Sequence, residues 1–394
     1  MTALQVINTI FGILIYPYLI RVLGASNYGL YVFALSITNY FGVFITFGFS
    51  IPALKLISEN KNNTLIKNQV ASAVFTSKSI FAILSCLIFA VLLFLIPDFK
   101  NNKFIFIVVF LQIFNNVIFP GWYFQGIQKM RIVTNIQLSL RILSLPFIFL
   151  FIKSKNDLLT YVIIVTATNL INAVVSLIYL YLKESIRYKW VRFSALKSYY
   201  IDALPFFWTA SASVLKEESV NILIGVFFGK KELAYFNLAE KIVSIPRMLT
   251  QNINDALFPK MILNKDKLSI RRIIGYETWI GISFIAFIAI FGRWIILLLG
   301  GNAMLSAYPL AVILSFTILV WLLVGIYTNF IFVPNRKFYF LTQNQLVAFI
   351  SFFLFCIPAL IFYTNIYSIV VSLILSGFAE IAYCNYLIKK NNFL

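Results

Sequence analysis

The sequence predicts an all-α polytopic membrane protein, with about twelve transmembrane helices in two six-helix lobes around a central polar cleft. Of its 394 residues, 61% are apolar and 11% are charged, whereas a soluble domain has roughly 45–50% and about 25%. Apolar runs of about twenty residues, long enough to cross the hydrocarbon core as a helix, recur from end to end. The ionisable residues inside these runs fall at helical spacing, which predicts polar faces turned away from lipid.

Charged interruptions divide the apolar runs into twelve predicted spans. Basic residues near span ends are retained in the cytoplasm. Nineteen of the 32 lysine and arginine residues follow even-numbered spans and eight follow odd-numbered spans. Both termini are therefore expected to be cytoplasmic. The predicted spans are 3–20, 28–49, 69–96, 104–124, 132–152, 158–182, 202–228, 233–258, 273–299, 308–333, 338–362 and 366–388.

The longest basic connector separates six spans from six. We therefore expect an N-terminal lobe at 1–182, a basic cytoplasmic linker at 183–201 and a C-terminal lobe at 202–394. A weak repeat at an offset of 205 aligns Gly24 with Gly229 and Gly29 with Ala234. Halves of six spans share one membrane orientation, as in the parallel repeats of many transporters. Chance similarity among common membrane residues is the alternative explanation.

Composition excludes several kinds of chemistry. Histidine is absent, which excludes zinc sites and general bases built on imidazole. The three cysteines lie in apolar runs without C-x-x-C spacing, and no G-x-x-x-x-G-K-[ST] motif occurs. We therefore expect no metal, no cofactor and no direct use of ATP. The net charge of +19 is read as a topology signal and an attraction to anionic membrane lipids rather than to nucleic acid.

The eighth span has the clearest polar face. A charge at mid-bilayer costs at least ~2.5 kcal/mol, so intramembrane ionisable residues normally face a bundle interior or a wet cavity. Polar residues recur here at intervals of three and four, which places them on one side of the helix. We interpret the stripe as the lining of a water-filled cleft; a polar seam between two helices is the alternative. Its candidate substrate and ion-coupling residues are Asn237, Glu240, Lys241, Arg247, Gln251 and Asp255.

The seventh span carries Lys216, Glu217 and Glu218 in succession. Three consecutive positions sweep about 200° of a helix, so they do not all face one narrow groove. Lys216 is a candidate cavity residue or the partner of Glu217 or Glu240 in an ion pair between spans seven and eight. A protonatable Glu217, Glu218 or Glu240 is a candidate for coupling transport to an H⁺ or Na⁺ gradient, because burial favours the neutral carboxyl. The sequence leaves these alternatives open.

The first half has a milder polar character. Arg141 is its strongest cavity candidate, because it lies near mid-span, where reaching the membrane surface is difficult. Lys78 is a second candidate, with burial by packing as the alternative. Amide residues such as Gln112 and Asn169 are read either as cavity lining or as hydrogen-bonding contacts between helices. A cleft of amides, hydroxyls and cations suits a hydroxyl-rich anionic solute.

The N-terminal run "YPYLIRVLGASNYGLYVFALSITNYFGVFITFGFSIPALKLISENKNN" resembles the opening of O-antigen flippases of the Wzx type. These form part of the polysaccharide transporter branch of the MOP superfamily, which also contains the MATE exporters. The features that resemble the family are the Pro-Tyr-Leu-x-Arg-x-Leu-Gly run from Pro17 to Gly24, the Tyr28–Tyr31 segment and the Phe47-Gly48-Phe49 turn. The segments at 119–130 and 223–242 also resemble the family.

The resemblance implies a MATE-like fold in the bacterial inner membrane. It also implies movement of an undecaprenyl-pyrophosphate-linked oligosaccharide from the cytoplasmic to the periplasmic leaflet by alternating access. In lipopolysaccharide O-antigen biosynthesis, the expected partners are membrane lipids, the O-antigen polymerase and the chain-length machinery. Two other functions are weighed against it: a polymerase-type membrane enzyme, which needs a sizeable extracytoplasmic loop, and a MATE-like exporter of small molecules, which needs a predominantly acidic cleft.

Overall fold

The computed structural model describes residues 12, 15–263 and 267–393, with the side chains of 255–263, 267 and 269 left out of the description. Every regular element in this part of the chain is helical, which confirms the all-α prediction. Nine helical segments within the described residues are long and apolar enough to cross a membrane. The first predicted span, 3–20, falls largely outside the described residues. Helices α11 and α12, which cover the seventh and eighth predicted spans, are long but carry the charged residues discussed below.

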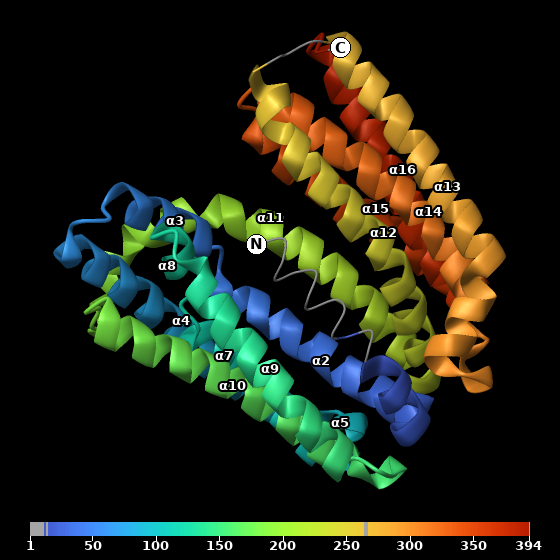
Figure 1. The fold of residues 1–394 in the computed structure, drawn as a ribbon, viewed down its shortest axis with the longest axis horizontal. Helices are drawn as coiled ribbons and strands as arrows, with labels where there is room; N and C mark the ends of the chain where they lie inside the picture. Colours follow the sequence, from blue (N-terminus) through green and yellow to red (C-terminus); the bar gives the residue numbers. More distant parts are fainter. Residues whose placement is uncertain (1–11, 13–14, 264–266, 394) are drawn as a thin grey trace. The chain divides into compact units, whose positions relative to one another are not determined.

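The helices divide into two compact units, residues 33–214 and residues 1–32 with 215–394. Helices α2 and α11 each contribute to both. The unit of residues 33–214 contains most of α2, the first part of α11 and the shorter and longer helices that lie between them in the chain (Figure 1). Its elements are α2 (Ala25–Thr46), α3 (Ser50–Glu59), α4 (Thr64–Leu95), α5 (Pro97–Asn101), α6 (Lys103–Phe110), α7 (Ile113–Ile118), α8 (Gly121–Gly126), α9 (Met130–Phe151), η1 (Lys155–Asp157), α10 (Leu158–Lys183) and α11 (Phe193–Phe227).

A tight turn ends α2 earlier than the predicted span 28–49. Phe47 and Gly48 both have positive φ, 40° and 69°, so the helix stops at Thr46 and α3 starts as a separate element. A Cβ at Gly48 would lie 2.5 Å from the backbone nitrogen of Phe207. Glycine is therefore favoured at position 48 for two reasons: it adopts the positive φ readily, and it has no Cβ to clash with the backbone of α11.

The predicted span 104–124 corresponds to a candidate membrane span, Lys103–Gly126, but its helix is interrupted and consists of α6, α7 and α8. Pro120 has no N–H and disfavours helical backbone at the residue before it, and Phe119 is accordingly extended, with ψ 116°. The carbonyl of Asn116 therefore lacks its usual donor four residues later. The ammonium of Lys78, on α4, donates to that carbonyl at 3.0 Å instead.

The connector between α10 and α11 is held along α4. We call residues 184–192 the strap. The backbone N–H groups of Arg187, Lys189 and Val191 donate to side-chain oxygens of α4 at 2.7, 2.9 and 3.2 Å. The acceptors are Asn68, Ser72 and Thr76, one helical turn apart.

The spacing of these bonds follows from backbone geometry. Two residues of extended chain advance about 6.6 Å and four residues of helix about 6 Å, so every second strap N–H meets the next turn of α4. Two of the residues that alternate with these donors pack against the protein: Ile186 is buried, and the ring of Tyr188 stacks on Phe75 with 4.6 Å between centroids. Trp190, the next residue in this alternation, is exposed. Glu184 pairs with Lys129 at 2.6 Å, and this hydrogen bond raises the pKa of the lysine.

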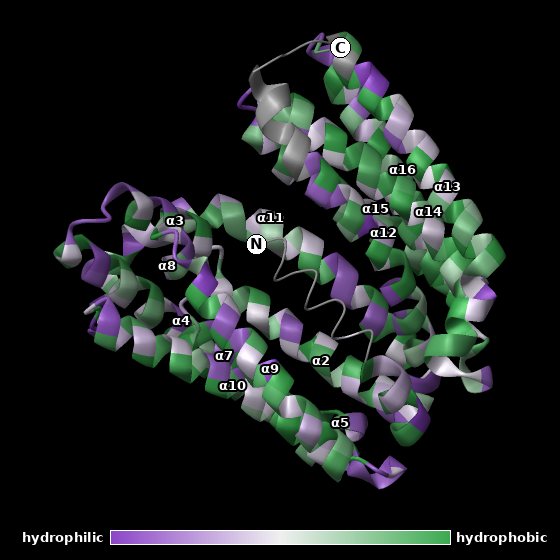
Figure 2. Ribbon diagram, in the orientation of Figure 1, coloured by the Kyte–Doolittle hydropathy of each residue, from purple (hydrophilic) through white to green (hydrophobic). Residues whose placement is uncertain are grey.

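The other unit contains the helix at 15–23 and the remaining elements of the chain. Figure 2 shows mainly hydrophobic residues along α13, α14 and α15, as expected for helices that cross lipid. An apolar core joins η3, α15 and α16 around buried residues such as Phe332, Phe340 and Leu387. The elements are α12 (Lys230–Leu263), α13 (Lys267–Gly300), η2 (Asn302–Met304), α14 (Ala307–Ile326), the π-helix η3 (Tyr327–Phe332), α15 (Phe338–Phe362) and α16 (Ile366–Lys390).

Two aligned glycines of the predicted repeat have the same conformation. Gly24 has φ 81° and Gly229 φ 96°, and each lies immediately before a long helix, α2 or α12. Each carbonyl accepts an N–H from the residue four positions later, Tyr28 or Leu233. The two junctions also meet, because Gly29 lies so close to α12 that a Cβ there would be 1.6 Å from the carbonyl oxygen of Lys230. The two aligned glycines thus share a backbone conformation and a position before a helix.

Candidate functional site

The predicted polar stripe lies on α12, which is 34 residues long. Asn237, Glu240, Lys241, Arg247 and Gln251 are each partly exposed, while the apolar residues Leu238, Ala239, Ile242 and Val243 on the other side are buried. The stripe is therefore the more open side of α12 from Asn237 to Lys241. Further along the helix, the apolar residues Leu249 and Ile253 are more exposed than Arg247 and Gln251. The side chain of Asp255, the last candidate of the stripe, lies outside the described part of the structure.

Lys241 is held by two tyrosines from the N-terminal region. Its ammonium donates to the Tyr28 hydroxyl at 2.9 Å, and that hydroxyl donates to the amide oxygen of Asn237 at 3.2 Å. The ammonium also lies 4.5 Å from the centre of the Tyr16 ring and 5.4 Å from that of Tyr28. Both distances are within the range of cation–π attraction. Lys241 is thus held in position by rings and a hydroxyl, which stabilise its charge, and no carboxylate of the described residues lies within 4.0 Å of its ammonium.

Arg247 lies two turns further along α12. Its guanidinium donates to the hydroxyl of Thr317 on α14, while its Nε is buried without a hydrogen-bond partner. Glu240 and Glu217 attract it electrostatically. A buried guanidinium N–H without an acceptor is unusual, since such groups normally find one. The guanidinium therefore has one buried N–H group that no acceptor of the described residues satisfies.

The carboxylates of the seventh and eighth spans belong to the same electrostatic group. Glu240 interacts with Arg247 and Lys241 on α12 and with Glu217 and Glu218 on α11. Glu217 and its neighbour Lys216 also interact with Glu380 of α16, which adds a third helix to the group. Salt bridges within 4.0 Å in the described part of the chain are Lys55–Glu59 and Lys129–Glu184. The sequence-based alternative of a Lys216 pair with Glu217 or Glu240 is therefore not found at contact distance; these charges act over longer range.

Two buried carboxylates of the same unit were not among the candidate site residues that we predicted from the sequence. Glu380, 5% exposed, accepts from the side-chain amides of Asn344 at 2.8 Å and Gln345 at 3.4 Å. Glu277, on α13 and also 5% exposed, bonds the Asn254 side chain. Glu277 lies inside the predicted span 273–299, so counting every acidic residue in each span would have found it. The sequence gives no indication that Tyr16 belongs to the site, because its ring reaches Lys241 only in the folded protein.

The two first-half candidates lie on α4 and α9. Lys78 is 3% exposed and donates to the Asn116 carbonyl. Its surroundings therefore fit the alternative that this lysine is buried by packing. Arg141 is partly exposed on α9, and its carbonyl accepts from the hydroxyl of Ser144 at 2.7 Å. The amides behave as contacts between helices. Gln112 donates to Thr166 at 3.1 Å and accepts from Asn169 at 3.3 Å, both on α10.

The link between Lys78 and the break at Pro120 can be measured as a coupling. We expect Lys78→Met to cost about 1–3 kcal/mol more in the native background than in a Pro120→Ala background, because the new backbone N–H gives the Asn116 carbonyl another donor. Thermal unfolding of the four proteins in detergent provides the comparison. Equal losses in both backgrounds would show that the lysine does not serve that carbonyl.

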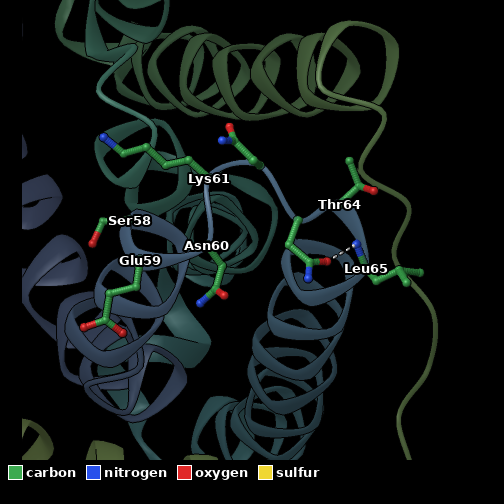
Figure 3. A pocket seen from close by; sticks show the side chains of 8 residues that line it. Ser58, Glu59, Asn60, Lys61, Thr64 and Leu65 are labelled. Carbon is green, nitrogen blue, oxygen red and sulfur yellow. Dashed lines mark hydrogen bonds between the residues drawn. The ribbon is translucent and has the colours of Figure 1, made fainter.

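A polar pocket of ≈ 590 Å³ opens at the turn between α3 and α4 and is lined by residues 58–65 (Figure 3). Its groups are mostly engaged locally. Asn63 caps α4 by accepting the N–H groups of Leu65 and Ile66, and Asn60 donates to the Leu56 carbonyl. No three carboxylate or thiol groups gather as a metal site in the described residues. The charged group on α11, α12 and α16 is therefore the strongest candidate site.

The fold is similar to the folds of solved multi-helix membrane proteins. It matches an inward-facing multidrug resistance MATE family transporter of the MOP superfamily with a TM-score of 0.67 and 13% identity, over 97% of this chain and 98% of that one. It also matches the lipid II flippase MurJ, in an inward closed conformation, with a TM-score of 0.69 and 13% identity, over 98% and 87% of the two chains. These likenesses confirm the predicted MATE-like fold.

The chain belongs to the polysaccharide biosynthesis protein family, whose model matches residues 1–263. It is 24% identical over 264 residues to a protein of Escherichia coli (strain K12) named "Putative O-antigen transporter", and 22% identical over 257 residues to a protein of the same name from Shigella dysenteriae. The alignments cover 66% and 64% of this chain and span 64% of the length of each relative. The family predicted from the N-terminal run is thereby confirmed.

Proposed function

We propose that this chain is a flippase that moves undecaprenyl-pyrophosphate-linked oligosaccharide repeat units from the cytoplasmic to the periplasmic leaflet in O-antigen biosynthesis. The family and the names of the relatives support transport of a lipid-linked saccharide. The observation that carries the proposal is the charged group on α11, α12 and α16, where Arg247 and Lys241 lie among carboxylates on helices of a membrane protein.

The chemistry of this group suits the headgroup of the proposed substrate. Pyrophosphate oxygens accept hydrogen bonds from guanidinium and ammonium groups, and sugar hydroxyls bond amides and carboxylates. Arg247 has a free Nε, and Asn237 and Gln251 present amides on the same face of α12. The polyprenyl chain would remain in lipid, where its burial has no cost. In this proposal Arg141 and Lys78 supply further positive charge from the first half.

Transport against a gradient needs a coupled ion. We assign this role to Glu217, Glu218, Glu240 or Asp255, with H⁺ or Na⁺ as the ion. Two six-helix lobes, 1–182 and 202–394, would alternate in access around a central cleft, joined by the linker at 183–201. Both termini would be cytoplasmic in the bacterial inner membrane, with the polymerase and the chain-length machinery acting on the released product.

The leaflet on which repeat units accumulate tests the function. In cells that lack the gene, lipid-linked repeat units should build up on the cytoplasmic side, and expression of this chain should restore surface polysaccharide. Protection of the saccharide from an added glycosidase in right-side-out vesicles reports the leaflet. Single repeat units capping the surface lipid would indicate a polymerase instead, and unchanged polysaccharide with altered drug resistance would indicate an exporter.

A further inference from the structure

The strap and the residues on either side of it carry a row of cations. Five basic residues fall within 183–197, against one carboxylate, Glu184, which is already paired with Lys129. All five of these cations are exposed: Lys183, Arg187, Lys189, Arg192 and Lys197. Arg187 and Lys189 belong to residues whose backbone N–H groups bond α4, so their backbone is immobilised while their side chains face outward. The two are about 6.6 Å apart along the extended chain.

Two exposed aromatic residues lie at one end of the strap, Trp190 within it and Phe193 at the start of α11. Trp190 is 65% exposed and Phe193 is 72% exposed, although both are large and apolar. They follow Lys189 in the chain, next to Val191, which bonds Thr76. Cations therefore occur along the whole strap, with Arg187 and Lys189 nearer to Asn68, whereas the exposed aromatic rings occur only at the end beside Thr76, on either side of Arg192.

The position along α4 relates this distribution to membrane depth. α4 has 32 residues and is about 48 Å long, longer than the ~30 Å hydrocarbon core requires. Apart from Leu65 in the first turn, its exposed large apolar residues begin at Ile83 and continue to Leu95. The strap runs beside residues 68–76, just before this surface starts. The aromatic end is thus the end nearer to hydrocarbon, which is where Trp is favoured in membrane proteins, and the cations lie at the level of lipid headgroups.

We propose that the strap is a binding site for anionic phospholipid headgroups, with Arg187 and Lys189 contacting phosphate and Trp190 inserted at the boundary with the acyl chains. The site depends on the membrane-spanning fold and on the position of the strap. It does not depend on which saccharide is transported. A neutral or zwitterionic lipid would satisfy Trp190 but not the row of cations, so the site selects lipids with net negative charge.

Fluorescence of Trp190 in the full chain tests the proposal. The protein is reconstituted in phosphatidylcholine nanodiscs containing a low fraction of brominated phosphatidylglycerol or, separately, the same fraction of brominated phosphatidylcholine. The quenching lost in a Trp190→Phe variant isolates the contribution of this residue. We expect phosphatidylglycerol to quench it more strongly, and the preference to weaken with added salt.

Removing the cations should remove the preference. Arg187→Gln with Lys189→Gln leaves the backbone bonds to α4 in place, so folding is retained, and we expect the selectivity for phosphatidylglycerol to fall roughly fivefold for each cation. Lys55→Gln with Lys61→Gln, two exposed cations of the α3–α4 region, is the charge-matched control and should leave it unchanged. Equal quenching of Trp190 by both lipids, no quenching, or an equal loss in the control would overturn the proposal. Retention of the preference in the double variant would also refute it.

Discussion

Arg247→Ala is expected to abolish surface polysaccharide in cells that depend on this chain. The guanidinium bonds Thr317, is attracted by Glu240 and Glu217, and keeps an unpartnered Nε. A hydrogen bond to a charged group contributes about 1.5–3 kcal/mol, so its loss corresponds to roughly 10- to 100-fold slower transport. Glu240 and Glu217 would also lose their strongest shared counter-charge. The measurement is the amount of surface polysaccharide at equal protein level, with the leaflet assay as the direct readout.

Two variants separate this role from folding. Arg293→Ala removes an exposed arginine of α13 and is expected to leave transport unchanged. Thr317→Val removes the partner of the guanidinium but keeps the charge, and is expected to reduce transport only in part. Normal polysaccharide in Arg247→Ala cells with a normal amount of protein would exclude this residue from the transport site.

Gly29→Val is expected to prevent stable folding. A Cβ at this position would lie 1.6 Å from the carbonyl oxygen of Lys230, a backbone atom at the start of α12 that moves only if the helix moves. Overpacking of well-fitted cores costs about 1–3 kcal/mol, and a clash with backbone is at the upper end of that range or above it. Size-exclusion profiles in detergent and thermal unfolding measure the effect.

Gly275→Ala is the matched comparison. Gly275 lies within α13 and has nothing within 4 Å of where its Cβ would be. The alanine variant is expected to be as stable as the original protein or more stable by about 0.5–1 kcal/mol, because alanine favours helix over glycine. An unchanged unfolding temperature in Gly29→Val would mean that α2 and α12 are not in close contact in the native protein.

Hydropathy and span length were sufficient to predict the helical class, but the interruptions of the helices depend on local backbone chemistry. The breaks at Gly48 and Pro120 are visible in the sequence as a glycine and a proline, yet apolar residues continue through both, so the hydropathy pattern does not mark them. The weak repeat aligned Gly24 with Gly229 but did not predict their conformation; the structure shows that both have positive φ, which glycine adopts readily.

The sequence was sufficient to predict which polar residues share one face of a helix. It was not sufficient to predict which residues these side chains contact. Helical spacing places Asn237, Lys241 and Arg247 on one side of α12 without the structure. The rings around Lys241 come from residues more than 200 positions away, and the acceptor for Lys78 is a carbonyl freed by a proline on another helix. Such partners depend on tertiary packing, and a carbonyl that lacks its donor leaves no mark in composition.

The ladder between the strap and α4 restricts insertions and deletions more than substitutions. Its bonds use backbone N–H groups, so most side chains at 187, 189 and 191 leave them intact. One residue added or removed between Glu184 and Arg192 would instead exchange the two sides of the extended chain, turning Arg187 and Lys189 toward the core and Ile186 and Tyr188 toward the outside. The length of this segment is therefore specified more strictly than its sequence.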